Sequence, residues 1–371
     1  MKQHHFLPVF LALIASYLGL HFYAARWLVK SFSLSPSAAA WLRTALLLAA
    51  FFSPFTMYLK RQWDSPALEP LYTAGYAWMG IILLAAFFFA CSDLASVLLR
   101  RAQAAGTIPP AAVLTALLFT LAWAFYGGLK APAVKEITVR LKGLPPGLEG
   151  YKIAQISDMH IDSAWKLREF AALVDEINAA SPDLVLITGD LIDPGITCQE
   201  NLAALTARLK SRQGVFGSPG NHEYYYGLEK AMGCYKAFGI TTLVNEAADL
   251  KDLRLIGFGD IHTENLSGPE VRSLLEKYRS DKLTVIMSHQ PVYYDLMAGT
   301  GNYLVLSGHT HRGQIFPFHI FTKLFYRYFY GLYRIKDSVF YVTSGAGTWG
   351  PPMRWLAPAE VPVITLLGAE K

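Results

Sequence analysis

Five short motifs of Asp, Asn, Gly and His are spread over the second half of the sequence. They are Ser157-Asp158-Met159-His160, Gly189-Asp190, Gly220-Asn221-His222-Glu223, Ser288-His289 and Gly308-His309-Thr310-His311. They offer carboxylate oxygens, an amide oxygen and imidazole nitrogens, without a thiolate. Such donors suit Mn, Fe, Co or Zn in a catalytic site better than a structural zinc, which is usually rich in cysteine. Two such ions, about 3.5–4 Å apart, can activate water and clamp a phosphoryl group.

Each motif alone is weak evidence for a metal site. An Asp that follows a strand is often a helix cap, and a single His in a loop is often only solvated. The Gly-His-Thr-His sequence at 308–311 would pass as an ordinary turn. Five such motifs at equivalent positions favour one shared site over five unrelated turns.

The elements that must position these motifs are short apolar runs typical of β-strands. Nine are expected: Glu136–Leu141, Tyr151–Ile156, Leu184–Thr188, Gly214–Ser218, Leu253–Phe258, Leu283–Met287, Tyr303–Leu306, Phe340–Thr343 and Pro362–Leu366. Helical spacing lies between them, at Leu167–Ala180, Asn201–Arg212, Leu228–Phe238 and Pro269–Arg279. This alternation predicts an α/β domain whose ligands gather beyond the carboxyl ends of strands, where each motif falls. Glycines beside Asp190, Asn221 and His309 would let the backbone turn tightly there.

The order and approximate spacing of the motifs resemble the calcineurin-like metallophosphoesterase superfamily, from about Lys152 to the end. The resemblance implies a four-layer αββα sandwich of two facing sheets flanked by helices. It implies two divalent metal ions, with Mn preferred and Fe, Zn or Co as alternatives. The first ion would be held by Asp158, His160 and His311. Asp190 would bridge to the second, completed by Asn221, His289 and His309. His222 would contact the phosphate and protonate the leaving oxygen.

The surroundings resemble a bacterial membrane-associated branch of that superfamily. The relevant residues are Gly313-Gln314-Ile315, Ser344-Gly345-Ala346-Gly347, Pro352 and Arg354. Some relatives in that branch act on glycolipid intermediates, including the pyrophosphate bond of UDP-diacylglucosamine. Arg312 stands where glycine is common, as a neutral substitution or as a substrate contact to a phosphate or headgroup. Ile315 to Tyr333 mixes aromatic and basic residues. It forms either a packed hydrophobic subdomain or, the reading we prefer, a membrane-facing surface that Trp349, Met353 and Trp355 could extend.

The sequence of the first part of the chain is typical of a membrane-spanning region. The sequence is 53% hydrophobic and 16% charged, which is apolar for a soluble protein. Four stretches are long enough to span a bilayer: Phe6 to Leu28, Ala38 to Leu59, Ala74 to Leu99 and Pro110 to Leu129. We therefore expect a four-helix transmembrane region over residues 1–131 and a hydrolase domain over residues 132–371.

Basic residues in the short loops favour a catalytic domain in the cytoplasm. The resemblance to the membrane-associated branch implies a multi-pass protein of the bacterial inner membrane. The cytoplasmic side would carry Lys2, Lys60, Arg61, Lys130, Lys135, Arg140 and Lys142, against Arg26, Lys30, Arg100 and Arg101 opposite. An error of one span would reverse this bias. Cys91, Cys198 and Cys234 share no disulfide or metal-site spacing, which favours three unpaired thiols.

The expected partners are the lipid bilayer and a phosphorylated or lipid-linked substrate. The net charge of +5 is assigned to membrane flanks, and no nucleic acid is expected. A nuclease or phosphomonoesterase of the same superfamily remains the alternative. A transporter would need more ionisable residues in its spans than Arg43 and Asp93. A scaffold with a vestigial hydrolase domain would show broken motifs, whereas all seven inferred ligands and His222 are present.

Overall fold

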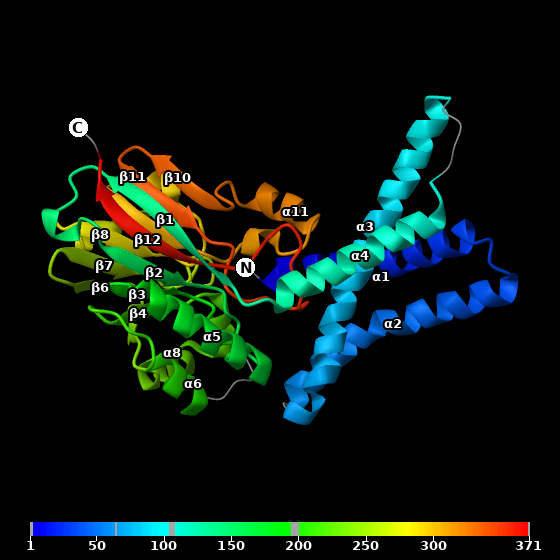
Figure 1. Ribbon diagram of the computed structural model, residues 1–371, viewed down its shortest axis with the longest axis horizontal. Coiled ribbons are helices and arrows are strands. Elements are labelled where there is room, and N and C mark those ends of the chain that lie inside the picture. The colour runs from blue at the N-terminus through cyan, green and yellow to red at the C-terminus, as the bar shows by residue number, and fades with distance from the viewer. Residues whose placement is uncertain (1–2, 64, 104–107, 194–199, 370–371) are drawn as a thin grey trace. The chain divides into compact units, whose positions relative to one another are not determined.

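The computed structural model describes residues 3–63, 65–103, 108–193 and 200–369, which fall into two compact units (Figure 1). The helical unit comprises Met1–Tyr126 together with Gly350–Trp355. The catalytic unit comprises Gly127–Trp349 and Leu356–Lys371. The short segment 350–355 thus belongs to the helical unit although it lies far along the sequence.

The helical unit contains α1 (Gln3–Ser31), α2 (Pro36–Gln62), α3 (Glu69–Arg101) and most of α4 (Pro110–Leu129). Within the described residues, α2, α3 and α4 are long and apolar enough to cross a membrane. The first expected span lies in α1, but several side chains near its start fall outside the described residues, so the count of four remains a prediction. Ser35 begins α2 by accepting a hydrogen bond from the Ala38 N–H, and Pro36 takes the first helical position.

Segment 350–355 packs on these helices. The Trp355 ring contacts the Phe87 and Phe88 rings at centroid distances of 6.3 and 6.0 Å, and the Arg354 N–H donates to the Ala124 carbonyl. Met353 is fully buried. The expectation that Met353 extends an exposed membrane-facing surface is therefore wrong. Trp355 is only partly buried, so its part in such a surface stays a prediction.

Two six-stranded sheets form the catalytic unit. The first has the order β1 (Ala133–Leu141), β12 (Glu360–Gly368), β2 (Lys152–Ile156), β3 (Leu184–Thr188), β4 (Val215–Ser218) and β5 (Thr241–Thr242). The second has the order β10 (Gly331–Ile335), β11 (Ser338–Val342), β9 (Tyr303–Ser307), β8 (Leu283–Met287), β7 (Leu253–Gly257) and β6 (Glu246–Asp249). Strands β2 to β5 run parallel, as do β7, β8, β9 and β11. Parallel neighbours bring their carboxyl ends to one edge of each sheet.

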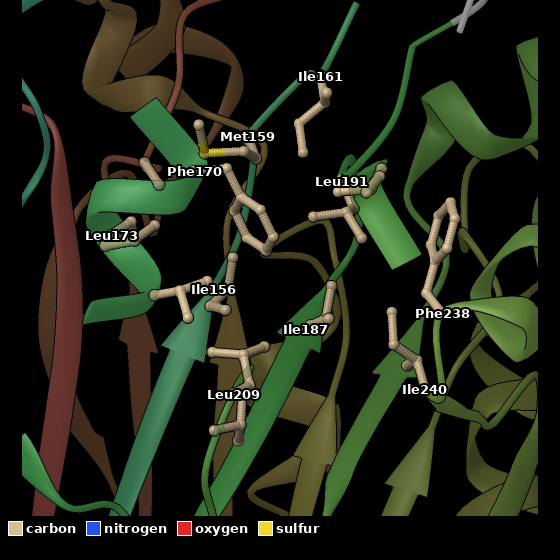
Figure 2. Close-up of a cluster of buried hydrophobic side chains, with 14 of the residues drawn as sticks. Ile156, Met159, Ile161, Phe170, Leu173, Ile187, Leu191, Leu209, Phe238 and Ile240 are labelled. Carbon is tan, nitrogen blue, oxygen red and sulfur yellow. The ribbon is translucent and has the colours of Figure 1, made fainter. Parts of the chain in front are cut away.

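Three apolar clusters hold the layers together. Residues of both sheets, including Ile153, Leu186, Leu255 and Leu306, bury their side chains against one another between the sheets. The outer face of the first sheet is covered by α5 (Ala164–Ala180), α6 (Glu200–Thr206) and α8 (Leu228–Ala237), as Figure 2 shows for part of this core. The outer face of the second is covered by α9 (Gly268–Lys277) and α10 (Tyr294–Met297). The predicted four-layer sandwich is confirmed.

All nine expected strands form, with ends shifted by a few residues, and β5, β6 and β10 are additional. Strand β6 reads Glu-Ala-Ala-Asp, which has little β-propensity. It is a strand because β7 supplies an antiparallel partner, from Glu246 opposite Gly257 to Asp249 opposite Arg254. Among the cysteines, Cys91 is free, Cys198 lies outside the described residues, and Cys234 is disulfide-bonded. The expectation of three unpaired thiols is thus wrong for Cys234.

Candidate metal centre

The first predicted donor set comes together beyond the ends of β2 and β9. Asp158, His160 and His311 each offer a ligand atom, and these atoms lie within 4.8 Å of one another. The His160 and His311 Nε2 atoms are 3.0 Å apart, and His311 Nε2 is 3.4 Å from Asp158 Oδ1. Asp158 and His160 are almost fully buried.

The second predicted set lies beside the first. Asp190, His289 and His309 form a group by the same criterion. The Asn221 Oδ1 atom is 2.9 Å from His309 Nδ1, which places the amide oxygen in the same group. Asp190 Oδ2 lies 3.1 Å from His289 Nε2 and 3.8 Å from His160 Nε2. The Asp190 carboxylate therefore faces both groups, as a bridging ligand must.

These residues fit a pair of divalent ions by their own geometry. Nitrogen and oxygen atoms bound to one ion at about 2.0–2.1 Å lie about 3.0–3.4 Å from each other. The separations of 2.9–3.4 Å given above within the two groups are close to this. The second ring nitrogens of His160 and His289 also have hydrogen-bond partners. The His160 Nδ1–H donates to Asp193 and the His289 Nδ1–H to the Thr188 carbonyl. This tautomer turns both Nε2 lone pairs toward Asp190, as in metal-binding histidines.

The backbone is strained where the donors sit. Asp158, His160, Asp190, His309 and His311 all have positive φ, between 46° and 68°. Such conformations cost of order 1–3 kcal/mol each in non-glycine residues and cluster at functional sites. The loops after β2 and β3 hold them in place by continuing the strand pairing: His160 N–H donates to the Asp190 carbonyl, and Ile161 N–H to Leu191.

The glycines of the motifs serve close approach more than turning. Of Gly189, Gly220 and Gly308, Gly189 alone has a positive φ. A Cβ at Gly189 would lie 2.7 Å from His289 Nδ1. At Gly308 a Cβ would collide with Asp158 Oδ2. Any side chain at either position would displace a donor.

His222 stands at the rim of the first group, with Asp193 as its partner. Its Nδ1 is 2.6 Å from Asp193 Oδ1, and its ring centroid is 4.5 Å from that of His160. Burial alone would lower the pKa of His222, but the bond to Asp193 and the charges of Asp190 and Glu223 raise it to about 9. The Asp193 carboxylate therefore favours the protonated form of His222, as a proton donor requires. The signal for Asp193 was its position three residues after Asp190, which sequence reasoning did not use.

Glu223 is a second functional residue that sequence reasoning did not assign. It is fully buried, and its carboxylate accepts hydrogen bonds from the N–H groups of Gly220, Asp190 and Leu191 at 2.7–2.9 Å and from the Tyr235 hydroxyl at 3.0 Å. One carboxylate thus fixes the loops that carry Asp190 and Asn221. Burial and the charge of Asp190 raise the pKa of Glu223 to about 7, against the effect of the backbone bonds.

Replacing Glu223→Gln should lower the affinity for metal by about 10–100-fold without unfolding the domain. Each carboxylate oxygen accepts from two backbone N–H groups. The amide nitrogen is a donor and cannot accept from them, so two N–H groups lose their partner. Isothermal titration with Mn²⁺ would measure the change. Tyr235→Phe, which removes a single hydroxyl donor to the same carboxylate, should change the affinity much less. Equal affinity in wild type and Glu223→Gln would contradict this positioning role.

Arg312 lies next to the first group, with its guanidinium carbon 4.4 Å from the centroid of the Tyr330 ring. The Tyr330 hydroxyl donates to Glu360, which also accepts from Lys135. Within the described residues Arg312 forms no ion pair. Its charge is stacked rather than neutralised, so a role as a phosphate contact remains a prediction.

Two donor groups that share a carboxylate, at the carboxyl edge of a two-sheet α/β sandwich, define a dinuclear metallohydrolase. The family model described as calcineurin-like phosphoesterase matches residues 151–313. A metallophosphoesterase of Helicobacter pylori strain J99 is 38% identical over 66% of this chain and 66% of its own length. Metallophosphoesterase YkuE of Bacillus subtilis is 32% identical over 62% of this chain and 84% of its own length. A transmembrane protein with metallophosphoesterase domain from Danio rerio is 30% identical over 77% of this chain and 70% of its own length. The chain belongs to the calcineurin-like phosphoesterase family, and the predicted resemblance is confirmed.

Proposed function

We propose that this phosphoesterase cleaves a phosphodiester or pyrophosphate bond in a lipid-linked substrate, such as a nucleotide glycolipid. The family supplies the hydrolase class, and helices long enough to cross a membrane support a position at a bilayer. The observation that carries the proposal is the shared carboxylate, Asp190, between two donor groups. Mn²⁺ is the ion we expect, with Fe, Zn or Co as alternatives.

In this proposal Asp158, His160 and His311 would hold one ion. Asn221, His289 and His309 would hold the other, and Asp190 would contact both. The ions would supply an activated water and charge neutralisation for the phosphoryl group. His222, paired with Asp193, donates a proton to the leaving oxygen from the rim. The exposed Tyr225 and Trp349 rings lie 5.2 and 6.1 Å from the His222 ring, so an apolar or ring-bearing leaving group would find partners there.

The bond type can be read from products. Purified full-length protein in detergent micelles with Mn²⁺ would be given a lipid pyrophosphate, a phospholipid diester and a lipid monophosphate, and products would be followed by ³¹P NMR. We expect phosphomonoester products from the first two substrates. Release of inorganic phosphate from the monoester alone would replace this proposal with a phosphomonoesterase.

Membrane orientation needs its own measurement. The basic residues favour a catalytic unit in the cytoplasm, and we retain that orientation, in a bacterial inner membrane, as the prediction. The disulfide at Cys234 argues the other way, because disulfides persist in oxidising compartments. Protease added to intact spheroplasts should leave the catalytic unit whole. Its digestion while a cytosolic marker survives would place the unit outside.

A further inference from the structure

The helix that follows the His309–His311 loop exposes its apolar side chains, whereas a helix on a soluble domain normally buries them. α11 (Phe318–Phe325) has no buried residue, and Leu324 and Phe325 are 77% and 82% exposed. Phe318, Ile320 and Phe321 are each about half exposed. At 100° per residue these five apolar side chains span about 160° of the helix circumference. A continuous exposed apolar stripe of this kind marks an interaction surface.

The side of α11 that carries His319 is the one turned toward the domain. A Cβ at Gly313 would lie 2.2 Å from the His319 Cα, so the helix backbone rests directly on the metal loop at that point. The His319 ring packs on Phe316 and Phe329 at centroid distances of 4.5 and 6.4 Å. With the His319 side inward, α11 presents its apolar arc outward, with the exposed Lys323 at its border.

The chain that follows α11 contacts the loops that carry the metal-site histidines. The Thr310 hydroxyl, between His309 and His311, donates to the Phe329 carbonyl at 2.8 Å. The Tyr326 hydroxyl donates to Gln290, next to His289, and the Tyr326 ring lies 5.4 Å from the His309 ring. Whatever α11 binds is therefore held beside the metal-binding loops.

We propose that α11 docks into the interface of the lipid bilayer and presents the apolar part of a phosphorylated lipid next to the metal centre. Its stripe of Phe, Leu and Ile with an adjacent cation is the composition of an interfacial helix. Lys323 is exposed and forms no ion pair within the described part of the chain, so it is free to attract anionic headgroups. The bilayer is the occupant because the same chain carries helices that can cross it, which keeps lipid at high effective concentration.

The docking itself is independent of the reaction; the assignment of a lipid substrate rests on the proposed function. A photoreactive residue reports docking directly. Full-length protein with Phe325→p-benzoylphenylalanine would be reconstituted in vesicles of phosphatidylethanolamine and phosphatidylglycerol that contain an alkyne-tagged phospholipid, then irradiated. Leu332, 41% exposed on the edge strand β10, is the matched control position.

We expect at least about tenfold more tagged-lipid adduct at position 325 than at 332. Equal labelling at the two positions would overturn the docking. A covalent dimer in place of a lipid adduct would overturn it as well, by assigning the stripe to a second copy of the chain.

A second measurement separates docking from substrate choice. Leu324→Ser combined with Phe325→Ser should lower hydrolysis of a vesicle-borne lipid pyrophosphate at least about tenfold relative to hydrolysis of bis-p-nitrophenyl phosphate. Leu332→Ser should leave that ratio unchanged. An unchanged ratio in the double variant would refute the role of α11 in lipid delivery. Failure of wild type on the soluble ester would instead count against the proposed function.

Discussion

Asp190→Asn should remove both metal and activity. The substitution keeps the size of the side chain but removes the charge from the atom that lies 3.1 Å from His289 Nε2 and 3.8 Å from His160 Nε2. Without a shared anion, two cations in neighbouring donor groups repel each other at short range. We expect bound Mn²⁺ to fall well below two per chain and hydrolysis to fall at least about a hundredfold.

The matched control is Asp175→Asn on α5, whose carboxylate is 66% exposed and pairs with Arg208. It should keep the full metal content and rate, since exposed ion pairs contribute little. Metal content by mass spectrometry and rate on a soluble diester would be measured for both variants. An Asp190→Asn protein that keeps two ions per chain would show that another group bridges them.

His222→Ala should give the opposite pattern, with metal retained and most of the rate lost. His222 lies at the rim, paired with Asp193, and is assigned no metal in our proposal. Loss of a positioned proton donor costs typically 10²–10⁴-fold. Metal content near that of wild type with a rate lowered by about that factor is the expected result.

The leaving group tells whether His222 acts as a proton donor. p-Nitrophenolate departs without a proton, whereas an alkoxide does not. The loss in His222→Ala should therefore be smaller for a p-nitrophenyl ester than for an alkyl ester of the same phosphate. An equal loss on both would assign His222 to phosphate binding rather than to protonation.

The positions of the metal motifs could be predicted because each depends on local sequence. A short apolar run followed at once by Asp, Asn or His is visible without knowledge of neighbouring elements, and parallel pairing then brings the run ends together. The strained conformations at Asp158 and His309 could not be predicted, since they depend on hydrogen bonds between loops about 150 residues apart, such as His309 N–H to Asp158 Oδ1.

The residues that could not be assigned from the sequence contact residues that are distant in the chain. Glu223 is the last residue of the Gly-Asn-His-Glu motif, but its carboxylate accepts hydrogen bonds from Asp190 and Leu191, more than 30 residues earlier in the chain. Asp193 touches His160 and His222, which no spacing rule connects. Segment 350–355 is predicted as part of the catalytic domain because it lies in a loop between two of that domain's strands. Its sequence gives no sign that it packs on Phe87 and Phe88 in the helical unit.

The central claim is that this chain is a two-metal phosphoesterase. Its most direct test is hydrolysis of bis-p-nitrophenyl phosphate by the purified full-length protein in Mn²⁺, with metal content measured on the same sample. We predict turnover that depends on the metal, with two ions per chain. A protein that binds no divalent metal and releases no p-nitrophenol would contradict the claim.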